Sequence, residues 1–161
     1  MTPAEPTVRL RPITADEFPA FVVVSKAGYA HDIEVHGGQT RQAAQEKADA
    51  DFPAVLPQGM ATPGHSIFIV EADGASVGRL WLAERPLGGR RVLFVYDVSI
   101  DPDHQGRGYG RATMTLAEEE ARARGIGRIE LNVFGGNDVA RNLYRSLGYA
   151  ETSVQMGKDL I

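Results

Sequence analysis

A glycine-rich loop is the clearest chemical signal in the sequence. It runs from Gln105 to Gly110 with glycine at positions 106, 108 and 110, and it lies between a strand-like run and a helical pattern. Glycine lets a ligand approach the backbone closely and lets neighbouring N–H groups point the same way. The N-terminus of the following helix adds about half a positive charge. The loop is therefore suited to bind a pyrophosphate group through backbone N–H groups.

Two nucleotide-binding motifs compete for this loop. A Walker A loop requires lysine after its last glycine, but Gly110 is followed by Arg111, which excludes that motif. A dinucleotide fingerprint fits Gly106 and Gly108 but has Arg111 at its third glycine position. Glu130 lies at about the distance expected of a ribose-binding carboxylate, so a dinucleotide-binding enzyme stays an alternative. A tight strand-to-helix connection without a ligand is the structural alternative.

A second group of residues follows the loop, and a predicted strand lies between the two. It consists of Asn137, Ala140, Leu143, Tyr144, Leu147, Gly148 and Tyr149. The loop and this group together resemble the GNAT superfamily of N-acetyltransferases. That family has a Gln/Arg-x-x-Gly-x-Gly/Ala loop and an Asn-x-x-Ala-x-x-Leu-Tyr-x-x-x-Gly-Phe/Tyr block. The resemblance extends from about Val8 to the end of the chain and is nearest to small bacterial members with a Val-Phe-Gly-x-Asn segment, here Val133–Asn137.

The resemblance implies an enzyme that moves an acetyl group from acetyl-CoA to a primary amine of a small cationic compound, a peptide or a protein. The strand before the loop is expected to splay from its neighbour, so that its free backbone groups pair with the coenzyme arm. Tyr144 is expected to be the general acid near the sulfur. The residues expected to bind the coenzyme are Val98, Ser99, Ile100, Gln105, Gly106, Arg107, Gly108, Tyr109, Gly110, Arg111, Asn137, Arg141 and Tyr144.

Several of these residues also have a purely structural explanation. Arg107 and Arg111 are equally consistent with solvated loop charges. Asn137 is a good N-cap in any helix. Tyr144 lies on the apolar stripe of its helix, where a tyrosine without the surrounding match would usually be core packing. A non-catalytic acyl-CoA sensor or interaction domain is therefore the alternative function.

The general base is not indicated by the family pattern. The two positions where many GNAT members carry a glutamate are occupied by Asn132 and Phe94. Asp97, Glu84 and Glu130 are the candidate bases. Asp97 lies in an apolar strand, where desolvation would raise its pKa, or where it would serve as a structural hydrogen-bond partner. We expect a water-mediated base or an amine that arrives deprotonated.

The region expected to shape the acceptor site is acidic and suits a cationic amine, although charges on surface helices are usually solvated. It contains Tyr29, His31, Asp32, Glu34, His36, Glu46, Asp49 and Asp51. His31 and His36 lack the i, i+4 spacing of two ligands on one helix face, so we expect no metal site.

The elements that position these residues can be predicted from pattern. Strands are predicted at Val8–Arg11, His65–Ala72, Ser76–Ala83, Arg91–Ile100, Arg128–Phe134 and Tyr149–Gly157. Helices are predicted from a capping box at Thr14–Glu17, over Thr40–Asp51, over Tyr109–Arg124, and from Asn137 to the glycine at 148. The order predicts an α/β fold with one mixed, mostly antiparallel central sheet flanked by helices on both faces.

Length, composition and charge exclude several classes of protein. The 161 residues predict one domain with residues 1–7 flexible. A net charge of −4 argues against nucleic-acid binding, and the absence of cysteine excludes a cysteine nucleophile, so the acetyl group would move directly. The longest apolar stretch, Phe18–Val24, is too short to span a membrane, and Met1–Thr7 lacks a signal-peptide pattern. We expect a cytoplasmic protein and, from the resemblance alone, a homodimer.

Overall fold

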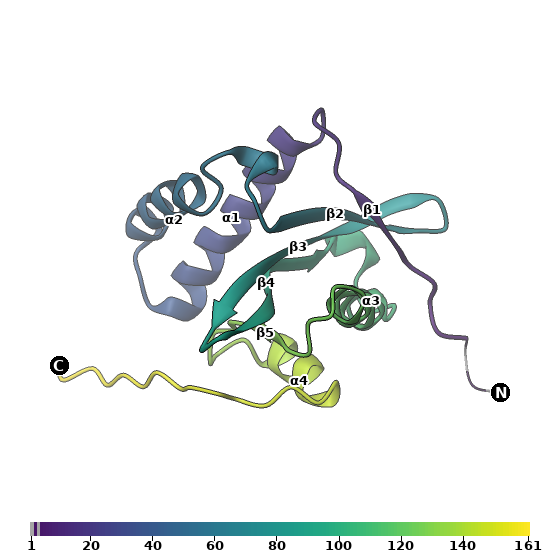
Figure 1. Ribbon diagram of the computed structural model, residues 1–161. Helices are drawn as coiled ribbons and strands as arrows, with labels where there is room; N and C mark the ends of the chain where they lie inside the picture. The colour runs from purple at the N-terminus through teal and green to yellow at the C-terminus, as the bar shows by residue number, and fades with distance from the viewer. Residues whose placement is uncertain (1, 3) are drawn as a thin grey trace.

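One five-stranded sheet, in the order β1-β2-β3-β4-β5, runs through the computed structural model, which describes residue 2 and residues 4–161 (Figure 1). The strands are β1 (Arg9–Pro12), β2 (His65–Ala72), β3 (Ala75–Leu87), β4 (Arg90–Ile100) and β5 (Ile129–Leu131). The helices are α1 (Phe18–Gly37), α2 (Arg41–Val55), α3 (Tyr109–Ala123) and α4 (Asp138–Ser146), with short 3-10 turns η1 (Gly59–Ala61) and η2 (Pro102–His104).

The sheet is mixed, as predicted. β1 to β4 pair antiparallel in chain order, and β4 pairs parallel with β5. Helices α1 and α2 cover one face, and α3 and α4 cover the other (Figure 1). Side chains alternate between the two faces of a strand. Leu80 and Leu82 of β3 therefore pack with Met114 of α3 on one face. Trp81, between them, packs with Phe21 of α1 and Phe52 of α2 on the other face. The predicted α/β class is confirmed.

The predicted capping box closes the turn that leads into α1, whose own N-cap, Glu17, makes no side-chain cap hydrogen bond. The Thr14 N–H donates to Glu17 Oε2 at 3.0 Å, and the Glu17 N–H donates to Thr14 Oγ1 at 3.3 Å. These reciprocal bonds satisfy N–H groups that a helix start leaves without partners. The regular helix begins one residue later, at Phe18, with proline in its first turn.

The strands β4 and β5 separate after three paired positions. Leu93 to Val95 pair with Ile129 to Leu131, and β4 then continues to Ile100 with β3 as its only neighbour in the described part of the sheet. A bulge at the level of Trp81 places Tyr96 without an opposite residue in β3. A bulge bends its strand and increases the local twist. The second half of β4 therefore has one open side, and the predicted splay is confirmed.

The predicted last strand is wrong. In the structure, residues 150–161 form no strand and lie exposed, and this tail runs away from the sheet (Figure 1). A strand requires a partner for its backbone groups. The tail instead begins against α4, where Glu151 Oε1 accepts from Arg141 Nη2 at 2.5 Å and from Arg145 Nη2 at 2.7 Å. The start of the tail is therefore bonded to α4 and not to β5.

The predicted flexibility of residues 1–7 can be compared with the structure at only some positions. Met1 and Pro3 lie outside the described residues. Pro6 lies within them, and its Cγ is 3.2 Å from the place that a Cβ at Gly108 would take. The segment before β1 therefore contacts the glycine-rich loop.

Candidate active site

A cavity of about 200 Å³ opens where β4 continues beyond β5. Helix α1 lines it with Ser25, Gly28, Tyr29, His31 and Asp32, strand β3 with Arg79, and strand β4 with Tyr96, Asp97, Val98 and Ser99. The cavity thus lies between α1, which carries residues of the predicted acceptor region, and β4, which is predicted to hold the coenzyme arm.

The glycine-rich loop presents free backbone donors. Gly106 and Gly108 have φ values of 76° and 82°, a left-handed conformation that favours glycine. Gly108 is the N-cap of α3, no side chain caps the helix, and the first N–H to donate back is that of Ala112, to Gly108 O at 3.1 Å. Within residues 4–161, the N–H groups from Gly106 to Arg111 have no protein acceptor. The loop therefore fits a pyrophosphate.

The start of α3 brings the three motif segments together. A Cβ at Gly110 would lie 3.6 Å from Leu143 Cδ2 of α4 and 4.0 Å from Ile100 Cγ1 of β4. Arg111 Nη2 donates to Ser146 Oγ of α4 at 2.5 Å. The loop, the end of β4 and α4 are therefore in direct contact.

Two other predicted coenzyme-binding side chains of the loop have partners within it. Gln105 Nε2 donates to the carbonyl of Ile100 at 2.9 Å, and Arg107 Nη2 lies 3.4 Å from the carbonyl of Asp103. These bonds shape the loop without using its backbone N–H groups. A role of either side chain toward the coenzyme stays a prediction.

Helix α4 holds Tyr144 against the core. Asn137 caps the helix, because its Oδ1 accepts from the Ala140 N–H at 3.2 Å. The Tyr144 ring lies 5.8 Å from the ring of Tyr149. Burial raises the pKa of Tyr144 to about 12, and the negative charges of Asp97 and Asp32 add to this effect. The hydroxyl therefore keeps its proton at neutral pH.

Arg141 is the predicted coenzyme contact with the most protein partners. Its Nη1 donates to the carbonyl of Gly135 at 2.6 Å, and its Nη2 donates to Glu151. The side chain joins α4 to the loop before it and to the start of the tail. Its role toward the coenzyme stays a prediction.

Of the three candidate bases, only Asp97 borders the cavity. Its Oδ2 accepts from Arg79 Nε and from Ser25 Oγ, each at 2.6 Å. Glu84 lies at the opposite end of the β3–β4 pair and is bonded to Arg91 at 2.7 Å. Glu130 pairs with its neighbour Arg128 at 2.6 Å.

Asp32 stands out among the acidic residues of the predicted acceptor region. Most of the others are partnered: Asp51 accepts from Tyr29 at 2.7 Å and from Lys47 at 2.8 Å, Asp49 pairs with Lys26 at 3.0 Å, and Glu34 pairs with Arg41 at 3.4 Å. Asp32 has no ion pair with any described residue and lines the cavity. Burial raises the pKa of Asp32, and the nearby His36 and His31 partly oppose this shift.

The sequence did not single out Arg79 and Tyr96 as site residues. Arg79 contacts Asp97 across the β3–β4 pair, and the ring of Tyr96 lies 4.7 Å from that of Trp81. Arg79 and Asp97 are opposite charges in two otherwise apolar strands. Because buried charges usually pair, this pattern could have predicted their ion pair. The position of Tyr96 at the cavity depends on the bulge in the β3–β4 pair, which no local pattern predicts.

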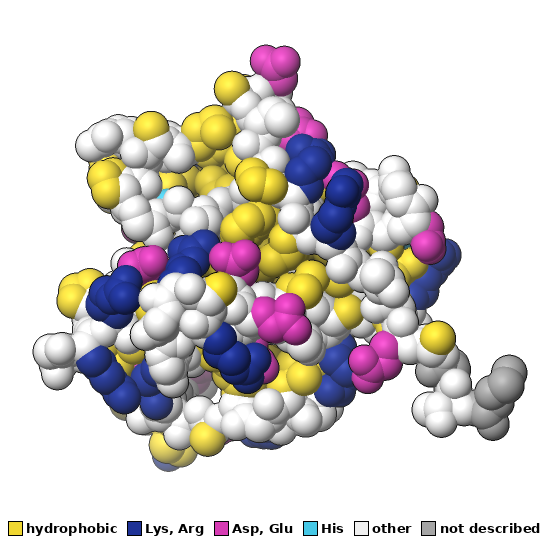
Figure 2. Space-filling view, turned by 45° about the vertical axis from the view of Figure 1, so that its right-hand side comes forward, with side chains coloured by type: hydrophobic (Ala, Val, Ile, Leu, Met, Phe, Trp, Pro, Cys, Tyr) yellow, Lys and Arg dark blue, Asp and Glu magenta, His cyan; other side chains and the backbone are white. Residues whose placement is uncertain are grey.

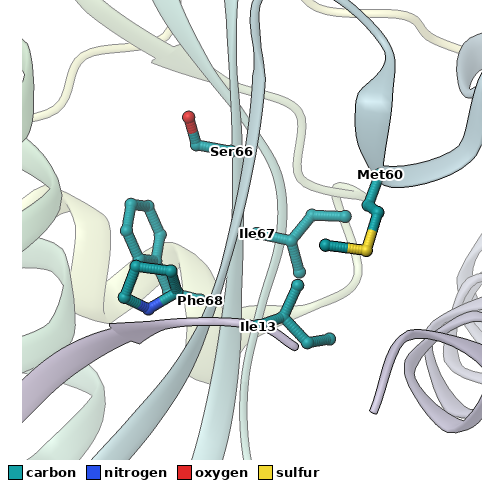
Figure 3. Close-up of a pocket in the computed structure, with 6 residues that line it drawn as sticks. Ile13, Met60, Ser66, Ile67 and Phe68 are labelled. Atoms are coloured by element: carbon teal, nitrogen blue, oxygen red, sulfur yellow. The ribbon is translucent and has the colours of Figure 1, made fainter. Parts of the chain in front are cut away.

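A second cavity of about 230 Å³ lies at the β1–β2 side of the sheet, away from the splayed strands (Figure 3). Ile13, Met60 and Ile67 point toward one another in it, with Phe68 on the other side of the strand (Figure 3). None of its lining residues is titratable. On the face shown in the space-filling view, hydrophobic side chains gather in a hollow with charged side chains around it (Figure 2).

Residue 2 and residues 4–161 lack two kinds of feature. No three His, Cys, Asp or Glu side chains in this part of the chain are grouped so that they could hold a metal ion. No helix in it combines the length and apolarity needed to cross a membrane.

A splayed parallel strand pair, a loop of free N–H groups and a half-buried tyrosine on the helix that contacts this loop fit an enzyme that binds a pyrophosphate-containing donor. The chain matches the model of the Acetyltransferase (GNAT) family over residues 28–149 and belongs to that family. The resemblance inferred from the loop and the second block is confirmed, and so is the assignment as an N-acetyltransferase.

Known relatives extend over most of the chain. It is 30% identical over 155 residues to YycN of Bacillus subtilis (strain 168), described as an uncharacterized N-acetyltransferase, with 96% of this chain and 99% of that protein covered. The crystal structure of YycN superposes with a TM-score of 0.90 over 96% of this chain and 99% of that chain.

One further relative matches part of the chain, and one further structure shares its fold. A mycothiol acetyltransferase of Saccharomonospora viridis is 41% identical over 96 residues, which is 55% of this chain and 31% of that protein. A predicted acetyltransferase from Clostridium acetobutylicum, solved with acetyl-CoA, shares the fold at 15% identity, with a TM-score of 0.65 over 96% of this chain and 97% of that chain.

Proposed function

We propose that this chain, as a single catalytic domain, transfers an acetyl group from acetyl-CoA directly to a primary amine. The amine belongs to a small cationic compound or to a peptide or protein. The observation that carries the proposal is the contact between a loop of unpaired N–H groups and the helix of Tyr144, beside a cavity lined by Asp32 and Asp97. We also propose a cytoplasmic location and a homodimer.

In the proposal, acetyl-CoA supplies the acetyl group as a thioester. The N–H groups from Gly106 to Arg111 hold the pyrophosphate, with Arg107 and Arg111 as charged neighbours. The open backbone of Val98, Ser99 and Ile100 holds the coenzyme arm, as hydrogen-bonding groups of an unpaired strand edge can. Asn137, Arg141 and Tyr144 contribute from α4. These contacts hold the donor still, so that attack by a bound amine becomes effectively unimolecular.

The residues of the cavity supply the proton transfers. An alkyl ammonium has an ordinary pKa of about 10.4 and must lose a proton before it attacks. All three candidate bases are ion-paired, and Asp97 is the best placed of them because it alone lines the cavity. Asp32 attracts the cationic amine. Tyr144 gives its proton to the leaving thiolate as the carbon–sulfur bond breaks.

Calorimetry with the purified protein tests the coenzyme class. Acetyl-CoA is expected to bind with a micromolar Kd, whereas NAD and ATP are expected not to bind, because free loop N–H groups without a Walker A lysine do not select a nucleoside triphosphate. Failure of both acetyl-CoA and free CoA to bind would refute the proposal, and binding of NAD would support a dinucleotide enzyme instead. Release of free thiol across a panel of amines then separates an enzyme from an acyl-CoA sensor.

Asp32→Asn is expected to raise KM for a diamine at least about tenfold and to change KM for a neutral, weakly basic amine far less, because the variant removes one attractive charge. The acidic limb of kcat/KM for the diamine should lie above the ordinary carboxyl range in the wild type, since the pKa of Asp32 is raised, and should shift in the variant. Asp49→Asn is the matched control, because Asp49 is exposed and paired with Lys26.

The free energy of unfolding of Asp32→Asn shows whether the substitution disturbs the fold. The folded state raises the pKa of Asp32, so its charged form opposes folding at neutral pH, and this cost disappears as the pH falls through the folded pKa. Asp32→Asn should therefore be at least as stable as the wild type at pH 7. A variant that is less stable, or that weakens both amines equally, would contradict a role in recognising the cation.

A further inference from the structure

Arg79 brings a permanent positive charge into the cavity that also contains the carboxylates of Asp32 and Asp97. A guanidinium carries its N–H donors in a planar fork. Arg79 donates from Nε to Asp97 Oδ2 at 2.6 Å, whereas its Nη1 and Nη2 make no hydrogen bond to any described residue. Neither Nη is enclosed, because the fully buried atoms without a partner in residues 4–161 are His104 Nδ1 and the Tyr149 hydroxyl. The terminal N–H groups of Arg79 are therefore available to a molecule in the cavity.

Gly28 of α1 makes room for this guanidinium. A Cβ on Gly28 would lie 3.2 Å from Arg79 Nη2, which is tighter than an ordinary van der Waals contact. Gly28 lies in the interior of α1, where glycine is less favourable than alanine because it loses more backbone entropy. Helix stability gives no reason for a glycine at this position. Space for the Arg79 side chain beside the cavity does.

The charges of the cavity have a definite pattern. Asp32, Asp97 and Arg79 give it two negative charges and one positive charge. They lie within range of one another: Arg79 is paired with Asp97, and burial raises the pKa of Asp32, with Asp97 and Arg79 among the smaller influences on it, in opposite directions. Recognition favours a ligand of complementary charge. Two ammonium groups and one carboxylate are the complement of this pattern.

We propose that the acceptor is a small diamino acid, whose carboxylate binds the terminal N–H groups of Arg79 and whose ammonium groups face Asp32 and Asp97. A carboxylate matches the guanidinium fork with two parallel hydrogen bonds. The cavity of about 200 Å³ is smaller than the roughly 300–1,000 Å³ of sites for drug-sized ligands, so it suits a molecule of this size.

The inference rests on the proposed function and narrows its acceptor. The transfer is unchanged: a nitrogen–carbon bond to the acetyl group forms and the carbon–sulfur bond breaks. Of the two protons that the ammonium loses, one ends on the thiolate and one in solvent. Arg79 takes no part in these steps. It selects the acceptor by its carboxylate.

Calorimetry with three probes tests the role of the carboxylate. Lysine, lysinamide and cadaverine share both amines, and their carboxylate is present, amidated or absent. The titrations are made with and without free CoA, which has no acetyl group to transfer, so binding is measured without turnover. Lysine is expected to bind at least about tenfold more tightly than either of the other two, because only lysine satisfies the Arg79 fork. Binding of lysine that is absent, or no tighter than that of lysinamide or cadaverine, would overturn the proposal.

Two variants test the geometry at Arg79. Arg79→Lys keeps a positive charge beside Asp97 but replaces the planar fork by a single ammonium group, so the preference for lysine over lysinamide should disappear. Gly28→Ala keeps the ion pair but places a methyl group 3.2 Å from Nη2. It should weaken the binding of lysine at least about threefold and that of cadaverine far less.

Arg91→Lys is the matched control, because Arg91 is paired with Glu84 outside the cavity, and it should retain the preference for lysine. An unchanged preference in folded Arg79→Lys, or equal effects on lysine and cadaverine in Gly28→Ala, would refute the assignment of the carboxylate to Arg79. Failure of acetyl-CoA and CoA to bind counts against the donor, whereas absence of a preference among the three amines counts against the diamino acid. The two failures are therefore distinguishable.

Discussion

Tyr144→Phe is expected to lower kcat at least about tenfold while leaving Kd for acetyl-CoA unchanged. The substitution removes only the hydroxyl, and the phenyl ring keeps its packing against the core side chains and Tyr149. A general acid contributes to the transition state and little to ground-state binding, so the loss should be in kcat. Initial rates of thiol release and calorimetry with acetyl-CoA measure the two quantities separately.

The raised pKa of Tyr144 adds a requirement on the pH profile. A hydroxyl with a pKa of about 12 keeps its proton over the working range. Its own titration therefore produces no alkaline limb below about pH 10. A loss of rate in that range must come from another group.

Tyr149→Phe is the matched control for the same chemical change. Its hydroxyl is buried without a hydrogen-bond partner, and burial raises its pKa in the same direction as that of Tyr144. Tyr149 follows α4 and is not among the residues proposed to contact the donor. The control should retain kcat and be at least as stable as the wild type, because removal of an unsatisfied buried hydroxyl relieves a desolvation cost. Equal losses in both variants, or an unchanged rate in Tyr144→Phe, would exclude Tyr144 as the acid.

The parts of the site that sequence predicted well are local in origin. The glycine loop depends on φ values that favour glycine at positions 106 and 108, and the cap at Asn137 depends on a bond to a residue three positions away. Such features leave a mark within a few residues of sequence. The order of strands and helices follows from periodicity in the same way.

The parts that sequence could not predict depend on distant neighbours. The predicted last strand is wrong because a strand requires a paired neighbour, and residues 150–161 pair with no strand of the described chain. The bonds of Glu151 to α4 join residues that are six and ten positions apart, which no local pattern predicts. Glu84 and Asp97 lie in adjacent strands, yet their sequence context does not show that Glu84 is bonded to Arg91 outside the cavity whereas Asp97 lines it. Asp32 becomes distinct from its acidic neighbours only once α1 is placed against β4.

Arg79→Met is expected to lower the free energy of unfolding by about 3–5 kcal/mol, because it leaves the carboxylate of Asp97 buried without its cation. The two side chains are only 13% and 18% exposed. Chemical denaturation at neutral pH measures the loss. Arg91→Met is the matched control: it breaks the pair with Glu84, whose members are 56% and 30% exposed, and should cost no more than about 1 kcal/mol.

The double variant Arg79→Met/Asp97→Asn should recover much of this loss, because a neutral amide is far less costly to bury than an unpaired carboxylate. Equal losses in Arg79→Met and Arg91→Met, or no recovery in the double variant, would contradict a buried, coupled pair. The Asp97 carboxylate also accepts from Ser25 of α1, so the same ion pair connects the helix that carries Asp32 to the strand that carries Val98. If the recovered double variant stays folded but loses acetyl transfer, the pair is needed for more than stability: it positions the acceptor helix against the donor strand, or Asp97 itself acts on the amine.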